Sequence, residues 1–330
     1  MTPALMRCGL VTTLLLTLGV VPKVRMKRTH HAPRDSGLCY AFMRDGDLWT
    51  ACQGKRERIH IADNVFDFAY SAAASSVAFL VDRPELRQRD PGELRSDLIL
   101  VNLTRQNQTT QKEVEFRLLF ATCGTILGWS AVGAHMHSPA DLISGNPIDT
   151  SSLTDFRCSS DRRVVLGYEK WDGQETQLIV KVDGKQTQSF SANVENPQDF
   201  DISANGKYMA FFTLNRGEES LCTYTIGGPA PCSLVTPGSK YQVSVSDLGA
   251  VLYTTDSDEA CGTGPCRGIA YWRLGMHAQE IIERKDAYSP QWITPDVAAA
   301  LHRWNTSHPA GVLSQGIVSG RFRPVRRPSA

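Results

Sequence analysis

The sequence predicts an all-β fold built from repeated units, and three observations support this prediction. In "FDISANGKYMAFF" the pair Asn205-Gly206 separates two runs of alternating apolar residues, which is typical of a hairpin. Similar stretches recur along the chain. No long segment with helical periodicity follows the apolar N-terminus, and 330 residues are enough to bury a large core.

A hydroxyl residue precedes the turn of each unit and aligns the repeats. These residues are Ser71, Ser159, Ser203, Ser246 and Thr294. The spacing is 44 residues from Ser159 to Ser203 and 43 from Ser203 to Ser246. The interval from Ser71 to Ser159 is twice this period, so one further unit is expected near residue 115. Each unit, including the one at Thr294, is expected to continue into a second apolar strand.

A repeat of this length with several short strands is typical of a β-propeller blade. One blade cannot bury both of its faces, so blades stack around an axis and close a ring. We therefore predict a β-propeller of six four-stranded blades, each of about 44 residues, over residues 39–318. We expect residues 29–38 to form a linker before it and residues 319–330 to form a basic tail after it. The hairpin at 39–52 is expected to supply outer strands that complete the last blade.

The repeats resemble those of TolB-like propellers, whose blades carry a Ser-Pro-Asp-Gly turn between two apolar strands. The matching residues are Ser203, Asn205, Gly206, Ala210 and Phe211 in one unit, Ser246, Gly249 and Tyr253 in the next, Ser71, Ala78 and Phe79 in an earlier one, and Pro295 and Asp296 in the last. The resemblance implies a propeller. Members of that family range from periplasmic protein-binding modules to the propeller gates of peptidases, so it implies no site residue here.

The N-terminus has the pattern of a targeting segment. Arg7 precedes "GLVTTLLLTLGVV", a run of 13 uncharged residues at positions 9–21. This run is short for a membrane span and suits the core of a signal peptide. We therefore interpret residues 1–28 as a signal peptide and predict a periplasmic or secreted protein. The alternative is a protein anchored in the membrane by an uncleaved N-terminal segment.

Eight cysteines outside the presumed leader suggest disulfides in an exported chain. In "CYAFMRDGDLWTAC" the pair Asp45-Gly46 favours a two-residue hairpin turn. Counting outward from this turn places Cys39 directly opposite Cys52, in a non-hydrogen-bonded pair where the two backbones come closest. That geometry accepts a bridge.

Three further bridges are predicted on other grounds. A three-residue loop at positions 226–228 would place Cys222 opposite Cys232. Proximity in a glycine-rich loop pairs Cys261 with Cys266. The remaining two cysteines lie in neighbouring units, which predicts the bridge Cys123–Cys158.

No pattern in the sequence identifies a catalytic or cofactor-binding residue. A propeller-gated peptidase needs a Gly-x-Ser-x-Gly elbow, which the sequence lacks, and we interpret the repeated serines as turn caps. His135 and His137 lie in one loop with Asp141. A His-x-His pair can ligate a metal, but no third ligand is identified in the sequence, so the metal prediction stays open. The acidic residues at 256–259 lack the oxygen spacing of a calcium loop and are interpreted as a solvated loop.

Two functional hypotheses follow. The net charge of +1 gives no reason to expect nucleic acid, and we predict a monomer that contacts a membrane only through its N-terminus. Long loops at 82–97 and 131–153 could form a surface for a protein, peptide or envelope component. The first hypothesis is therefore a non-enzymatic binding propeller. The alternative is a hydrolase or lyase with a site assembled from several blades at the channel, which the convergence of three or more ionisable groups would favour.

Overall fold

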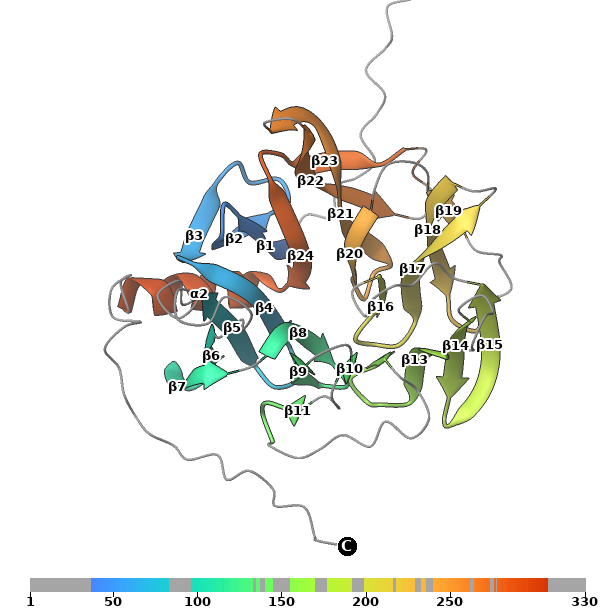
Figure 1. Cartoon of the computed structure of the whole chain (residues 1–330), viewed down its shortest axis with the longest axis horizontal. Helices are drawn as coiled ribbons and strands as arrows, with labels where there is room; N and C mark the ends of the chain where they lie inside the picture. Colours follow the sequence, from blue (N-terminus) through green and yellow to red (C-terminus); the bar gives the residue numbers. More distant parts are fainter. Residues whose placement is uncertain are drawn as a thin grey trace, which may run out of the picture. The chain divides into compact units, whose positions relative to one another are not determined.

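The computed structural model describes most of the chain from Gly37 to Ser307. The described residues are 37–82, 96–114, 116–132, 135–136, 140–144, 155–169, 177–191, 199–215, 218–228, 233–235, 240–261, 264–273, 276 and 278–307. Within these ranges the strands form six four-stranded antiparallel sheets (Figure 1). The predicted domain boundaries at 28 and 318 and the basic tail lie outside them.

The first three sheets consist of the strands between Cys39 and Asp141, joined by one strand from the C-terminal part of the chain. The first contains, in spatial order, β24 (Ala287–Ile293), β1 (Cys39–Arg44), β2 (Asp47–Cys52) and β3 (Arg58–Ala62). The second contains β4 (Val65–Ser71), β5 (Ser76–Asp82), β6 (Ser96–Asn102) and β7 (Asn107–Val114). In the third, β9 (Thr125–Val132) pairs with β8 (Phe116–Thr122), β10 (His135–Met136) and β11 (Ala140–Asp141).

The other three sheets follow one another along the chain. The fourth contains β12 (Asp155–Cys158), β13 (Val164–Glu169), β14 (Gln177–Val182) and β15 (Lys185–Ser191). The fifth contains β16 (Phe200–Ile202), β17 (Tyr208–Asn215), β18 (Glu218–Thr225) and β19 (Ser233–Val235). The sixth contains β20 (Lys240–Val245), β21 (Ala250–Cys261), β22 (Gly264–Arg273) and β23 (Glu280–Glu283).

The first sheet joins the two ends of the fold. Cys39 and Tyr40 of β1 pair with Ile293 and Trp292 of β24. The prediction that the hairpin at 39–52 completes the last unit is confirmed. The unit expected near residue 115 is also present, as the third sheet. Its turn escaped the sequence pattern because Cys123-Gly124, both with positive φ, replaces the usual Asn-Gly pair.

Two predicted turns illustrate what local sequence determines. Asp45 and Gly46 both have positive φ, and their hairpin pairs Cys39 with Cys52 as predicted. The predicted register of Cys222 is wrong, because β18 pairs Cys222 with Leu234. The turn closes early, with a hydrogen bond from Gly228 N–H to the Thr225 carbonyl. The "PAP" sequence that follows has two prolines without N–H groups, which disfavours an immediate return strand.

The repeated serines cap turns, as interpreted. The Ser203 hydroxyl accepts hydrogen bonds from the N–H groups of Lys207 and Tyr208, and the Ser246 hydroxyl accepts one from Ala250 N–H. The acidic residues at 256–259 do not form a loop, contrary to the interpretation from the sequence. They belong to the long strand β21, whose ladder with β22 is irregular between Asp256 and Ala260 and resumes as far as the Cys261–Gly264 pair.

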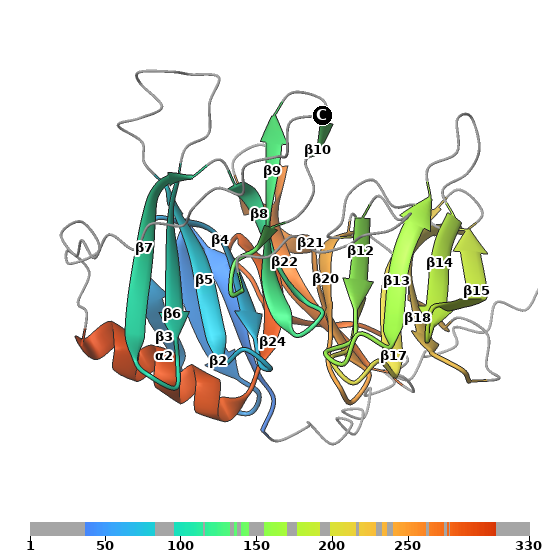
Figure 2. The same ribbon diagram turned by 90° about the horizontal axis from the view of Figure 1, so that it is seen from below.

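The unit aligned on Thr294 does not continue into a second strand, contrary to expectation. It continues into the helix α2 (Pro295–Ser307). Thr294 caps this helix, because its hydroxyl accepts a hydrogen bond from Val297 N–H at 3.3 Å. Pro295 suits the first helical turn, and the alanine-rich run favours a helix. Figure 2 shows α2 along one edge of the first two sheets, where Trp304 is 1% exposed and its ring lies 5.5 Å from that of Phe79.

The core lies between neighbouring sheets. Large side chains such as Phe42, Phe79, Phe200 and Phe211 are almost fully buried there. Within the described ranges, no helix is both long and apolar enough to cross a bilayer.

Candidate functional site

The first strand of every sheet lines one cavity of about 80 Å³. The lining residues are Asp67 and Phe68 of β4, Leu119 to Ala121 of β8, Arg157 of β12, Asp201 of β16, Gln242 to Ser244 of β20, and Ser289 to Gln291 of β24. We call this cavity the waist. Because residues from all six sheets meet there, no short sequence motif could have revealed it.

Side chains of these first strands also join the sheets to one another. Each first strand is an edge of its sheet, so some of its N–H groups lack a partner in the ladder. Several of these N–H groups donate hydrogen bonds to side-chain oxygens of the neighbouring first strand. The donor and acceptor residues are Leu119 and Asp67 (2.7 Å), Cys158 and Thr122 (2.8 Å), Val245 and Asp201 (2.8 Å), Trp292 and Ser244 (3.3 Å), and Tyr70 and Gln291 (2.9 Å). Polar residues at the waist therefore hold neighbouring sheets together.

Three ionisable side chains converge at the waist. Burial raises the pKa of Asp67 to about 7, although hydrogen bonds from the backbone of Leu119 and Phe68 oppose this shift. Burial also raises the pKa of Asp201 to about 6, against the opposing charge of Arg157. The Nε atom of Arg157 lies 3.9 Å from Asp201 Oδ1.

The Arg157 guanidinium also stacks on an aromatic ring, at 3.8 Å from the centroid of Phe120. Sequence reasoning missed this group. One signal could have indicated two of its members. Arg157 and Asp201 are charged residues two positions before the capping serines Ser159 and Ser203, so each lies on the same face of its strand as the serine.

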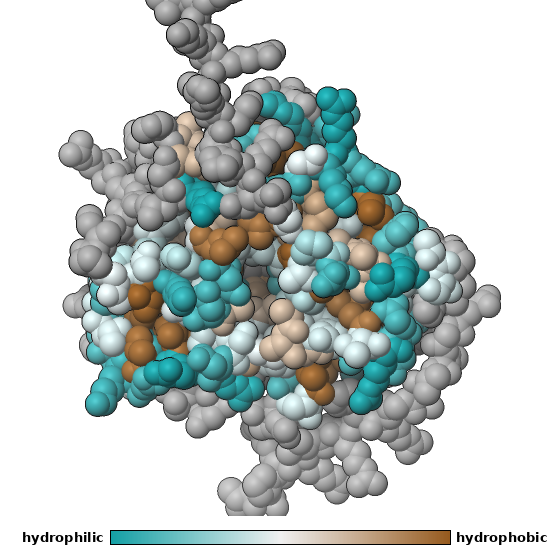
Figure 3. Space-filling model, turned by 180° about the vertical axis from the view of Figure 1, so that it is seen from behind, coloured by the Kyte–Doolittle hydropathy of each residue, from teal (hydrophilic) through white to brown (hydrophobic). Residues whose placement is uncertain are grey.

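A larger cavity of about 240 Å³ lies next to the waist, and we call it the mouth. It shares Ala121, Asp201, Ser244 and Gln291 with the waist. Leu248 stands at the mouth with 51% of its surface exposed. Only one other large apolar side chain in the described part of the chain, Ile143, is comparably exposed, at 38%. Figure 3 shows a recess near the centre of one face of the molecule.

The mouth is poor in charge. Among the described residues that line it are two carboxylates, Asp201 and Asp247, and no lysine, arginine or histidine. Asp247 accepts a hydrogen bond from Asn205 N–H at 2.8 Å, so it also contributes to the contact between neighbouring turns. The mouth therefore offers apolar surface with a slight acidic character.

Two of the cysteine pairs that the sequence predicts lie at disulfide distance. The Cα atoms are 3.9 Å apart for Cys39–Cys52 and 4.7 Å apart for Cys123–Cys158, and the second pair borders the mouth. Cys222 and Cys266 are also disulfide-bonded. The side chains of their predicted partners, Cys232 and Cys261, lie outside the described part of the structure.

The predicted histidine pair yields no described metal centre. His137 and the side chain of His135 lie outside the described residues. Asp141 instead caps a local turn, because its carboxylate accepts hydrogen bonds from Thr125, Ile143 and Ser144. Burial acts to raise its pKa, but these hydrogen bonds hold the pKa below the usual value.

A different set of possible ligands occurs on the surface. Asp47, His60 and Asp63 place one ligand atom each within 4.8 Å of the others, and all three are partly exposed. His60 Nε2 lies 3.1 Å from an oxygen of Asp63 and 3.6 Å from an oxygen of Asp47, so the three side chains already contact one another. Much of the predicted partner loops at 82–97 and 131–153 lies outside the described residues, including 83–95 and 145–153. The described part of the second loop contains the short strands β10 and β11.

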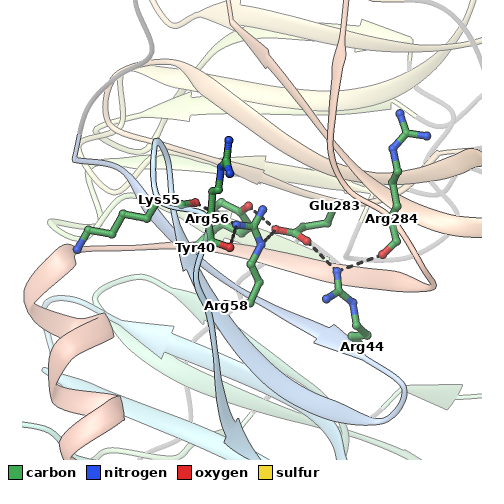
Figure 4. Close-up of polar contacts among 7 residues, drawn as sticks. All are labelled: Tyr40, Arg44, Lys55, Arg56, Arg58, Glu283 and Arg284. Atoms are coloured by element: carbon green, nitrogen blue, oxygen red, sulfur yellow. Dashed lines mark hydrogen bonds and ion pairs between the residues drawn. The ribbon is translucent and has the colours of Figure 1, made fainter.

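A buried ionic network joins the sixth sheet to the first (Figure 4). Glu283 of β23 is 4% exposed and accepts 2.7 Å hydrogen bonds from Tyr40, Arg44 and Arg58. Arg58 also donates to the carbonyl of Lys55, which fixes the turn before β3. This network supports the junction between the sheets and lies apart from the residues that line the waist.

Comparison with solved structures identifies the fold. Neither a protein-family model nor a curated protein matches the sequence. TolB from Acinetobacter baumannii superposes with a TM-score of 0.57 at 14% identity over 78% of this chain. This match spans 66% of the TolB chain. A chain of the nidogen/laminin complex superposes with a TM-score of 0.50 at 10% identity, covering 78% of this chain and 98% of that one. The chain therefore has a β-propeller fold that is remotely similar to the TolB propeller.

Proposed function

We propose that this chain is an exported, non-enzymatic β-propeller of six blades that binds a segment of a protein or peptide at its mouth. The observation that carries the proposal is the mouth itself, about 240 Å³ of weakly charged cavity beside the exposed Leu248. A cavity of this size accommodates a few side chains, and its volume is below the usual range for pockets that bind drug-sized ligands. Exposed apolar surface beside a preformed cavity is a common feature of binding sites.

Several findings support the architecture and the compartment. The six four-stranded sheets, with β24 paired to β1, are consistent with a closed six-bladed ring. The disulfides fit an oxidising compartment such as the periplasm or the exterior. One structurally similar chain was solved in the nidogen/laminin complex, which supports protein binding by this fold. We propose that the chain acts as a monomer.

The alternative hydrolase or lyase also has a specific observation in its favour. Asp67, Arg157 and Asp201 converge at the waist, and the two carboxyl groups have raised pKa values. The size of the waist opposes this function, because about 80 Å³ holds a few water molecules and excludes most substrates. Both carboxylates also accept backbone N–H groups from neighbouring strands, which gives them a structural role.

Selection from a displayed random peptide library tests the proposal. Selected peptides should bind the wild-type protein and the Ile143→Asp variant equally, and the Leu248→Asp variant at least tenfold more weakly. Ile143 is the matched control, because it is exposed and apolar but does not line the mouth. Failure to select any peptide, or equal binding to both variants, would contradict binding at the mouth.

The same preparations test the alternative. The protein is assayed with ester, phosphoester and glycoside model substrates. Turnover that is lost in both Asp67→Asn and Asp201→Asn, but kept in Asp183→Asn, would favour the enzyme over the binding propeller.

A further inference from the structure

The charge of the waist indicates which chemical group the bound segment presents. Two carboxylates and one guanidinium line this cavity, and its other lining residues in the described structure are uncharged. With both carboxyl groups ionised, the set has a net charge of −1. A buried charge without compensation is costly, so a group of charge +1 would be stabilised there.

We infer that the waist binds the ammonium group of a lysine side chain from the segment that occupies the mouth. This inference rests on the proposed function and specifies its ligand. A lysine suits the arrangement because its apolar stem can lie along the mouth while its compact ammonium reaches the waist. The carboxylate that would bind the ammonium at the boundary of the two cavities is that of Asp201, because Asp201 lines both.

The hydrogen-bonding capacity of the carboxylates matches this ligand. Asp67 and Asp201 each accept backbone N–H groups, and a carboxylate has about four acceptor sites. Asp201 Oδ1 is 3.9 Å from Arg157 Nε, which is beyond hydrogen-bond distance, so this pair leaves the oxygen able to accept from another donor. An ammonium group provides three donors and no acceptor.

The presence of Arg157 favours a monovalent over a divalent cation. A divalent ion would leave the waist with a net charge of +1 and would lie close to the guanidinium. The ammonium brings the net charge to zero. Electrostatic balance therefore favours a group of charge +1, such as the lysine ammonium, over a divalent ion.

Binding of the ammonium should compete with protons. Burial raises the pKa of Asp67 to about 7 and that of Asp201 to about 6, so both carboxyl groups bind protons between pH 8 and pH 5. Among the described residues, the charged or titratable groups that act on these carboxyl groups are Arg157 on β12, which affects both, and Tyr288 on β24, which lies near Asp67. Burial raises the pKa of Tyr288, so it stays neutral over this range. The affinity for lysine should fall as the pH falls.

The experiment uses small probes, so that it does not depend on knowing the partner. Two probes are titrated into the protein and followed by NMR at pH 8 and pH 5. They are Nα-acetyl-lysine amide, which keeps the side-chain ammonium, and Nα-acetyl-norleucine amide, which lacks it. The lysine probe should bind at least tenfold more tightly than the norleucine probe at pH 8. Its affinity should fall at least tenfold at pH 5.

Variants assign the effect to the waist. Asp201→Asn should abolish the preference for lysine, while the amide oxygen still accepts the Val245 N–H group. Asp67→Asn should weaken lysine binding and remove part of the pH dependence. Asp183→Asn is the matched control, because Asp183 pairs with Arg163 on the surface and lines neither cavity. Its affinity for the lysine probe should equal that of the wild type.

Several outcomes would overturn the inference. These are equal binding of the two probes, an unchanged preference in Asp201→Asn, and tighter binding of glycyl-leucine amide, whose ammonium is an amino terminus. Calcium binding that depends on Asp201 without any lysine preference would overturn it as well. If peptides bind through Leu248 without preferring lysine, the inference fails and the proposed function stands. If the lysine probe binds but no peptide is selected, the proposed function fails and the ammonium site stands.

Discussion

Tyr40 of β1 donates a 2.7 Å hydrogen bond to the buried carboxylate of Glu283 in β23, although 243 residues separate them in the sequence. The same carboxylate binds Arg44 and Arg58. Replacing Glu283 by glutamine would leave two guanidinium groups facing a neutral partner. We expect Glu283→Gln to lower the free energy of unfolding by about 3 kcal/mol.

Urea denaturation of the purified protein measures this loss. Tyr40→Phe removes only the neutral donor and should cost about 1 kcal/mol. Asp183→Asn, which breaks a solvent-exposed ion pair with Arg163, should leave the denaturation midpoint unchanged. A midpoint for Glu283→Gln equal to that of the control would contradict a stabilising role of the network.

The buried carboxyl group of Asp67 should make stability depend on pH. Burial raises its pKa from 3.8 to about 7, so the folded state binds this proton more tightly than the unfolded state. Stability from this group is fully present below about pH 4 and is lost as the pH rises towards 7. We expect Asp67→Asn, which removes the charge, to be more stable than the wild type at pH 8 by on the order of 2 kcal/mol.

Denaturation at pH 5 and pH 8 checks this expectation. The gain of Asp67→Asn should be much smaller at pH 5, where the wild-type carboxyl group is largely protonated in the folded state. An equal gain at both pH values would mean that the effect is not linked to ionisation of Asp67.

The disulfide between Cys39 and Cys52 should stabilise the junction of the chain ends. We expect the double variant Cys39→Ser/Cys52→Ser to lose on the order of 3 kcal/mol, because the bridge restricts the unfolded chain. Peptide mapping of the unreduced protein should show this bridge and Cys123–Cys158. It should also pair Cys222 with Cys232 and Cys261 with Cys266. A Cys39 linked elsewhere would contradict the hairpin register.

The helix α2 should contribute to the core of the first two sheets. Trp304 is almost fully buried and packs against Phe79, so Trp304→Ala should lower the free energy of unfolding by about 3 kcal/mol or more. Arg303→Ala changes an exposed neighbour on the same helix and should have little effect. Equal thermal midpoints for the two variants would show that α2 does not stabilise the sheets.

The sequence by itself determined the features that depend on neighbours along the chain. The alternation of apolar residues indicated strands, and the recurring serine turns indicated a repeat. Asp45-Gly46 determined that Cys39 pairs with Cys52, because a two-residue turn adopts only a few conformations and so sets the register of the two strands that it connects. Where local signals conflicted, the prediction failed. The prolines after Gly228 shifted the register of β19, and Thr294 began a helix after the last strand.

The tertiary structure alone decided which distant residues meet. Asp67, Arg157 and Asp201 occupy ordinary strand positions and gave no catalytic or binding motif. They converge because the first strand of every sheet lines the same cavity. The same arrangement leaves edge N–H groups that these side chains satisfy, and it removes most of the surface of the carboxyl groups from water, which raises their pKa values. Burial and convergence depend on the packing of six sheets, so spacing along the chain does not encode them.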